Sequence, residues 1–273
     1  MKMSFGCDLV YDVAQTTTFI FNVAAAQQPQ HSGLEETWIV EPKLDLQAFT
    51  AGLNRYTRLT AQPGPLRLRY EASVDVNLTL RDPQGIGETP LDILPLDIFP
   101  YLMPSRFSPS DLVAEQAERE FSGLPQGHAR VTGICNWIYD TIAYRPGTSD
   151  PTTSAIETLN ARAGVCRDFA HLGIAFCRAM NIPARLVSCY APALEPPDFH
   201  AIFEAYLDGQ WWLFDPTRQA KLDGIVRIGT GRDAAEVSFA SIYGDAQPTG
   251  MTVWAQPAAG DASLEFRPIE AVG

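Results

Sequence analysis

The sequence predicts an α+β protein in which helices pack on an antiparallel sheet, preceded by an N-terminal β-sandwich domain. Three observations lead to this prediction. The first third alternates apolar and polar residues, most clearly over residues 66–80. The middle of the chain places apolar residues at helical spacing, most densely over residues 160–180. Beyond that helix, Asp208-Gly209 joins two apolar runs, and this dipeptide is a strong hairpin signal.

The size and charge of the chain limit its class. At 273 residues it can form one large domain or two ordinary ones with a substantial core. Its 20 basic and 32 acidic side chains give a net charge of -12, so we expect neither nucleic acid nor a membrane as a partner. The start of the chain holds no long apolar segment and meets Asp8 at once, so we expect no secretory signal.

Cysteine usage indicates a reducing compartment. The five cysteines are an odd count without a Cys-x-x-Cys pair, which favours free thiols and predicts a cytoplasmic location. The four histidines lack ligand spacing on a helix and no Asp-rich calcium loop is present in the sequence, so we expect no metal and no cofactor. The cysteines are Cys7, Cys135, Cys166, Cys177 and Cys189.

The N-terminal domain is predicted to span residues 1–82. Residues 5–13 and 19–23 alternate in the same way as residues 66–80, which have one dry and one wet face, as in an antiparallel sandwich. A proline-rich crossing segment follows at residues 83–108. Its apolar side chains, such as Ile93 and Phe99, predict that it packs along the surface of the second domain, residues 109–273.

Three helices are expected before the centre of the second domain. The first has Ser108 as its N-cap and ends at Gly123, and the second spans residues 128–143. Ser154 and Glu157 form a capping box for a third, short helix.

Cys166 is expected in the first turn of the central helix, because Gly164 breaks the chain just before it. The unpaired N–H groups and the positive dipole end of that turn favour a thiolate, which would make Cys166 a nucleophile. The alternative is a small buried residue, the commonest role of a cysteine. The choice depends on whether a base and an orienting group lie nearby.

The hairpin supplies both groups. If Leu207 pairs with Gln210 across the Asp208-Gly209 turn, Asp215 lies on the same face of the sheet as His200, roughly 7–8 Å away at the backbone. The hairpin can therefore hold an imidazole against a carboxylate. Further strands are expected at residues 184–190, 225–228, 251–254 and 264–266.

Cys166, His200 and Asp215 together form a candidate nucleophile, base and orienting carboxylate. A thiolate attacks a carbonyl carbon, an imidazole carries the proton to the leaving amine, and a carboxylate fixes the imidazole tautomer. A cysteine at a helix N-terminus, followed by partners on two adjacent strands, is typical of a papain-like arrangement.

Four segments of the chain resemble the transglutaminase-like superfamily, and more narrowly its bacterial branch of transglutaminase-like cysteine proteases. The resemblance implies a papain-like, transglutaminase-core domain behind a β-rich one, with Cys166 as nucleophile, His200 as base and Asp215 as orienting carboxylate. A downstream stretch, residues 227–235, is similar to a signature of the same branch. The four segments are Gly-Val-Cys-Arg-Asp-Phe-Ala-His, Asn-Ile-Pro-Ala-Arg-Leu-Val-Ser-Cys-Tyr, His-Ala-Ile-Phe-Glu-Ala-Tyr and Trp-Trp-Leu-Phe-Asp-Pro-Thr.

Three further residues are candidates for the oxyanion hole or the cleft. Arg167 stands where the family often has Gln, and Ile202 stands where an aromatic residue often follows the His-Ala pair. Both positions flank the triad, so the departures bear on substrate preference. The Cys166 backbone N–H is one expected oxyanion donor. Relatives add an aromatic donor upstream, for which Tyr144 is the candidate, with structural packing as its alternative role.

The resemblance implies thiol-dependent attack on an amide bond of a peptide or protein through an acyl-enzyme, which water then hydrolyses. One alternative is transamidation, in which an amine such as lysine takes the acyl group. A second alternative is a catalytically silent binding module that keeps the fold.

Overall fold

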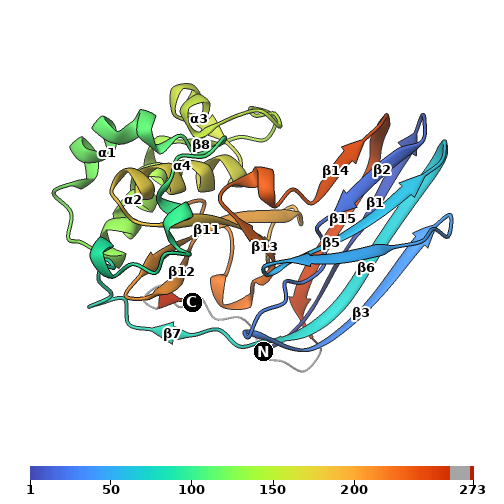
Figure 1. Cartoon of the computed structure of the whole chain (residues 1–273), viewed down its shortest axis with the longest axis horizontal. Helices are drawn as coiled ribbons and strands as arrows, with labels where there is room; N and C mark the ends of the chain where they lie inside the picture. Colours follow the sequence, from blue (N-terminus) through green and yellow to red (C-terminus); the bar gives the residue numbers. More distant parts are fainter. Residues whose placement is uncertain (259–270) are drawn as a thin grey trace.

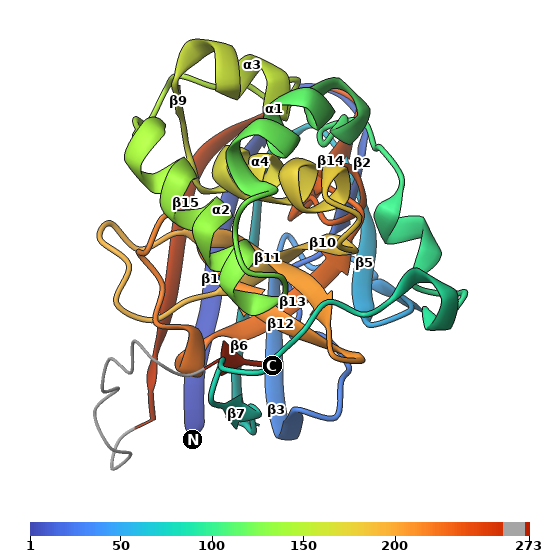
Figure 2. The same cartoon turned by 90° about the vertical axis from the view of Figure 1, so that its left-hand side faces the viewer.

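The computed structural model describes residues 1–258 and 271–273. The molecule has two halves side by side: long twisted strands form one, and helices on a shorter sheet form the other (Figure 1). Turned by 90°, the helices lie in front of the shorter sheet, with the long strands behind (Figure 2). The predicted α+β class is therefore confirmed. The strand expected at residues 264–266 lies outside the described residues.

The N-terminal half is a sandwich of two four-stranded antiparallel sheets. Buried and less buried residues alternate along the strand predicted over residues 66–80, which ends earlier, at Val76. The first sheet has the order β15 (Ala246–Pro257), β1 (Lys2–Val13), β6 (Gly64–Val76), β3 (His31–Glu41). The second has the order β14 (Ala240–Tyr243), β2 (Thr17–Phe21), β5 (Asn54–Ala61), β4 (Gln47–Ala51).

Four sandwich strands were not predicted from the sequence: β3, β4, β5 and β14. β3 and β4 are edge strands, and hardly any of their residues are buried. Their sequences therefore lack the apolar alternation that marks a half-buried strand. β5, between β4 and β2, has a partly buried pattern that the sequence analysis overlooked.

The last strands of the chain return to the sandwich. β15 pairs with β1 over its whole length, and β14 pairs with β2. Residues 240–257, which the prediction assigned to the second domain, therefore belong to the sheets of the first. The reason is long-range strand pairing, which local sequence patterns do not encode.

The second half is built on a four-stranded antiparallel sheet covered by α4 (Cys166–Ala179). Gly173 makes the close contact between them, since a Cβ there would lie 2.5 Å from the Phe203 ring. The sheet order is β12 (Gln210–Phe214), β11 (Phe199–Leu207), β10 (Ala184–Tyr190), β13 (Val226–Gly231). Three further helices surround α4: α1 (Ala114–Phe121), α2 (His128–Thr141) and α3 (Ala155–Ala161).

The two halves share a hydrophobic core. Tyr190, Val226 and Ile228 belong to the second sheet but are buried among the sandwich side chains. The Tyr190 hydroxyl donates to the Val23 carbonyl oxygen at 2.7 Å. Separating the halves would expose these side chains, so the sandwich supports the second sheet directly.

The crossing segment is packed over only part of its length. Ile98 is buried, and Tyr101 packs edge-on against Trp211 with ring centroids 5.2 Å apart. Its first part is not packed as predicted, because the apolar side chains there point to solvent. These exposed residues are Leu91, Ile93, Leu96 and Phe99.

The first helix begins later than predicted. Ser108 is buried and its hydroxyl donates to the His171 carbonyl oxygen at 3.1 Å, so it ties the chain to α4 and does not cap a helix. A 3₁₀ turn, Ser110–Val113, then leads into α1. The capping box predicted for α3 is present, with the Ser154 amide donating to Glu157 at 2.6 Å.

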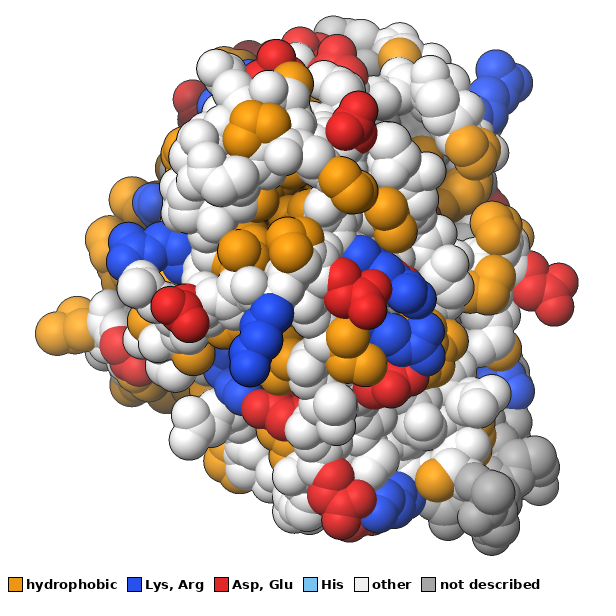
Figure 3. Space-filling model, turned by 90° about the vertical axis from the view of Figure 1, so that its right-hand side faces the viewer, with side chains coloured by type: hydrophobic (Ala, Val, Ile, Leu, Met, Phe, Trp, Pro, Cys, Tyr) orange, Lys and Arg blue, Asp and Glu red, His pale blue; other side chains and the backbone are white. Residues whose placement is uncertain are grey.

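The surface mixes both signs of charge. On the face that Figure 3 shows, basic and acidic side chains lie interspersed with hydrophobic ones, and neither sign forms a continuous patch. Within the described residues, none of the helices has the length and apolar character needed to cross a membrane.

Arg178, near the end of α4, joins three distant segments. It is 3% exposed, and its guanidinium donates to the carbonyl oxygens of Ala184, Met103 and Arg232. It also donates to the Ser105 hydroxyl at 2.9 Å. The crossing segment is thereby fixed to the second half.

Arg178→Met should lower the free energy of unfolding by about 3 kcal/mol or more, because several buried oxygens would lose their donor. Urea unfolding measures the loss. Arg119→Met is the matched control: the Arg119 side chain is 65% exposed beside Glu120, and its loss should cost about 0.5 kcal/mol or less. Equal stabilities of the two variants would contradict the role given to Arg178.

Candidate active site

Cys166 is the first residue of α4, as predicted. The Asp168 carboxylate accepts a hydrogen bond from the Val165 amide at 2.9 Å, which fixes the start of the helix. Gly164 allows this turn, because a Cβ there would lie 2.8 Å from Asp168 Cβ. Cys166 is partly exposed and therefore accessible to a substrate, whereas Cys177 and Cys189 are buried.

The hairpin has the predicted register, with Leu207 opposite Gln210. His200 Nε2 and Asp215 Oδ2 lie 2.9 Å apart, so the predicted imidazole–carboxylate pair is present. The Asp215 carboxylate also accepts from the Thr217 hydroxyl at 2.6 Å and from the Ala220 amide at 2.9 Å. These bonds leave the carboxylate a single orientation toward the imidazole.

The Cys166 side chain lies close enough to the His200 imidazole to favour its protonated form. Since Nε2 is engaged by Asp215, the ring nitrogen left for the thiol is Nδ1. Burial alone would lower the pKa of His200, but the bonds to Asp215 and Cys166 outweigh it and raise the pKa to about 10. Burial by itself would raise the pKa of Asp215. The hydrogen bond from His200 outweighs burial, so the pKa of Asp215 lies below its usual value. An imidazolium therefore persists beside Cys166 at neutral pH.

Tyr144 lies beside the nucleophile candidate. It belongs to the short strand β8 (Ala143–Tyr144), which pairs in parallel with β9 (Ala163–Gly164), two residues before Cys166. Its hydroxyl is within hydrogen-bonding reach of the Cys166 amide and thiol. Partial burial and the proximity of Cys166 raise the pKa of Tyr144 to about 12, so the phenol keeps its proton. The ring packs against Phe169 at 5.8 Å, so packing and hydrogen bonding coexist.

The other two flanking candidates do not face the thiol. The Arg167 guanidinium donates to the Asp150 carbonyl oxygen at 2.7 Å and to the Asp168 carboxylate at 3.0 Å, so it anchors a loop to the helix start. Ile202 is fully buried among Val187, Cys189 and Leu213, so it cannot line a cleft. The suggestion that Ile202 lines the cleft is therefore wrong: although Ile202 shares a face of β11 with His200, its side chain is covered by the small core that it forms with Val187, Cys189 and Leu213.

Sequence reasoning missed one residue of the site. Thr217 binds Asp215 through both its amide and its hydroxyl, at 2.9 and 2.6 Å. The Asp-Pro-Thr sequence was the available signal, because an Asp that accepts from the amide two residues later forms a common turn. Among the described residues, none of the groups of His, Cys, Asp and Glu has the arrangement of a metal site.

Comparison with known proteins places this geometry in a family. Residues 115–216 match the model of the transglutaminase-like superfamily, and residues 1–94 match that of the bacterial transglutaminase N-terminal domain. A crystal structure described as a putative cysteine protease from Cytophaga hutchinsonii is 40% identical, with a TM-score of 0.94 over 100% of this chain and 96% of that one. The chain belongs to the transglutaminase-like superfamily.

Curated relatives match over shorter stretches. An uncharacterised protein of Mycobacterium leprae is 28% identical over 165 residues, which are 56% of this chain and 58% of that protein. One from Mycobacterium tuberculosis is 36% identical over 119 residues, 38% of each chain. The chain thus aligns with 58% or less of the length of these curated relatives.

Iodoacetamide should alkylate Cys166 about tenfold or more faster than the other cysteines at pH 6, because an imidazolium stands beside it. Burial raises the pKa of Cys177, of Cys189 and of Cys7, the last to about 12. Peptide mass spectrometry after timed labelling measures each rate.

His200→Ala should slow the alkylation at pH 6, and the deficit should shrink as the pH rises toward about 10, where the native imidazolium is itself lost. Asp215→Asn should slow it less. Equal labelling of all five cysteines in the native protein would refute the assignment of the nucleophile.

Proposed function

We propose that the protein carries out thiol-dependent acyl transfer at amide bonds of peptides or proteins, ending in hydrolysis. The single observation behind this proposal is that one buried imidazole, His200, is bonded through Nε2 to Asp215 and lies beside Cys166. Membership of the transglutaminase-like superfamily and the likeness to the Cytophaga protein support the same chemistry. We also propose that the protein is cytoplasmic and that it binds a peptide or protein substrate.

The first half-reaction follows from the ion pair. The Cys166 thiolate attacks the amide carbonyl carbon, and the His200 imidazolium gives its proton to the amine nitrogen. The C–N bond then breaks, the amine leaves, and a thioester joins the acyl group to Cys166. Asp215 holds the imidazole in the orientation that this proton transfer needs.

The second half-reaction reverses these roles. Neutral His200 takes a proton from water, and the resulting hydroxide attacks the thioester carbon. The C–S bond breaks, the carboxylic acid leaves, and the proton on His200 restores the ion pair with Cys166. An amine in place of water would give transamidation by the same steps.

We propose two donors for the tetrahedral oxyanion: the Cys166 backbone N–H and the Tyr144 hydroxyl. The first N–H groups of a helix have no acceptor within the helix, so the Cys166 amide can point at a substrate oxyanion. The protonated phenol of Tyr144 lies beside the same amide. A substrate oxygen between the two would accept from both.

Mass analysis can tell hydrolysis, transamidation and silent binding apart. Incubation with a peptide library and a labelled primary amine, followed by intact-mass analysis, distinguishes them. We expect a transient acyl adduct that is absent in Cys166→Ala, with free acid as the product. Transfer of the label would establish a transamidase, and peptide binding without an adduct or product would indicate a silent module.

Tyr144→Phe should lower kcat about 100-fold on any substrate so found and leave KM nearly unchanged, because a donor to the oxyanion acts mainly in the transition state. The phenyl ring keeps the contact with Phe169. Tyr243→Phe is the control, since Tyr243 lies exposed on β14 in the sandwich. An unaltered kcat in Tyr144→Phe would assign Tyr144 to packing alone.

A further inference from the structure

β4 is an exposed edge strand of the sandwich. It ends the sheet that also contains β14, β2 and β5, and all of its residues, Gln47–Ala51, are exposed. It pairs with β5, which follows after a turn at residues 52–53, so that Ala51 lies opposite Asn54. Within the described residues, no hydrogen bond from outside this hairpin reaches the backbone of β4. The far side of β4 is therefore open to another strand.

The hairpin register shows which backbone groups of β4 face away from β5. In a two-residue hairpin the residues that flank the turn exchange both of their hydrogen bonds, and bonded and non-bonded pairs then alternate along the strands. Gln47, Phe49 and Ala51 therefore bond to β5. The N–H and C=O groups of Ala48 and Thr50 point outward, where they can bond to a further strand.

β4 lacks the features that protect the other edges of the sandwich. Edge strands are usually protected by charges, prolines, bulges or a cover. β3 carries three glutamates and a register shift after Ser32, and β15 contains two prolines. β14 is only partly exposed over most of its length. β4 has the sequence Gln-Ala-Phe-Thr-Ala, without a charge or a proline, in a protein of net charge -12.

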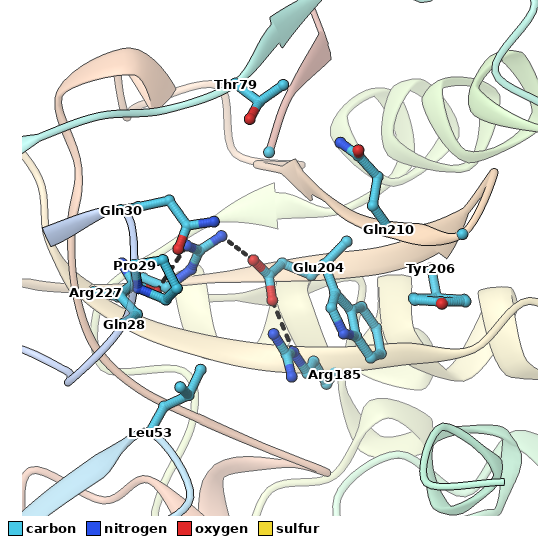
Figure 4. Close-up of a pocket in the computed structure, with 13 residues that line it drawn as sticks. Gln28, Pro29, Gln30, Leu53, Thr79, Arg185, Glu204, Tyr206, Gln210 and Arg227 are labelled. Atoms are coloured by element: carbon cyan, nitrogen blue, oxygen red, sulfur yellow. Dashed lines mark hydrogen bonds and ion pairs between the residues drawn. The ribbon is translucent and has the colours of Figure 1, made fainter. Parts of the chain in front are cut away.

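The hairpin is anchored at its turn. The Asn54 side chain exchanges two hydrogen bonds with the backbone of Thr230 in β13, at 2.8 and 2.9 Å. Leu53 lines the junction between the two halves of the molecule, where Arg227 donates to Gln28 at 2.9 Å (Figure 4). An edge that is already ordered loses less conformational entropy when it binds another strand.

We propose that β4 pairs antiparallel with β4 of a second copy of this chain, about a twofold axis at Phe49. In this register Ala48 of each copy lies opposite Thr50 of the other, so every outward donor meets an acceptor. The two Phe49 residues form the non-hydrogen-bonded pair between them, whose side chains lie closest. Each Phe49 ring is 48% exposed and already stacks on Tyr56 at 5.0 Å, so the dimer has a continuous aromatic stack.

The charges around β4 favour a second copy as the occupant. The register places Gln47 opposite Ala51 of the second copy, so like charges do not face each other. The cavity of about 290 Å³ beside the strand has one charged pair in its lining, Glu36 with Arg55 at 2.6 Å, which is neutral as a whole. Two copies of net charge -12 repel each other elsewhere, so they meet best at an uncharged edge. Two short strands bury little area, so we expect a weak dimer with a Kd of about 10–100 μM.

Sedimentation velocity of the intact chain over a range of concentrations measures this dimer. Salt screens the repulsion between two acidic copies, so the dimer should be tighter at about 500 mM than at about 50 mM NaCl. A monomer up to about 500 μM, well above the Kd expected for a small interface, would overturn the proposal. So would a dimer that dissociates as the salt concentration rises, because its contacts would join opposite charges.

Phe49→Lys is the informative variant, because it places two positive charges directly opposite each other across the twofold axis. The Kd of the dimer should rise about tenfold or more. Tyr243→Lys makes the same change in charge at the opposite edge of the same sheet, where Tyr243 is 64% exposed, and should leave the Kd unchanged. Equal Kd values for the two variants would refute pairing through β4, and the alkylation rate of Cys166 reports separately that each variant is folded.

A disulfide tests the register. In a Cys166→Ala background, Phe49→Cys should form a covalent dimer on mild oxidation, because the Cβ atoms of directly opposed residues lie within reach of a disulfide. Tyr243→Cys in the same background should remain monomeric on a non-reducing gel. Absence of the covalent dimer in Phe49→Cys, or equal cross-linking of both variants, would contradict the twofold axis at Phe49.

Discussion

The packing of α4 on β11 is the constraint on which the candidate active site depends. Phe203 fills the space that Gly173 leaves open, and this contact fixes the distance between helix and sheet. The N-terminal end of α4 then places Cys166 beside His200, which lies three residues before Phe203 on β11. The hairpin adds Asp215 without further adjustment, because its register alone determines which face that carboxylate occupies.

The sandwich also supports the strands that carry the candidate site. Cys189 pairs with His200, and the next residue, Tyr190, already belongs to the core of the sandwich. The strand that carries the imidazole is thus supported from the far half of the molecule. The returning strands β14 and β15 close the sandwich and tie the end of the chain to its beginning. The two matched family regions therefore share one hydrophobic core.

Electrostatics distinguishes His200 from the other histidines. Burial lowers the pKa of His31, His128 and His171 to about 4, since none of them has a carboxylate bonded to the ring. The same burial at His200 is outweighed by its neighbours Asp215 and Cys166, and its pKa rises instead. Two neighbouring groups thus favour the protonated form of a buried imidazole.

The sequence by itself determined the class, the helix start at Cys166 and the hairpin that brings His200 to Asp215. These features depend on local periodicity and on one tight turn, whose geometry few residues specify. Only the tertiary structure decided that residues 240–257 complete the sandwich and that Ile202 is buried. It alone also brought Gln28 to Arg227, across 199 positions of sequence. Pairing of strands and of buried charges over such separations depends on the whole fold, and no local pattern records it.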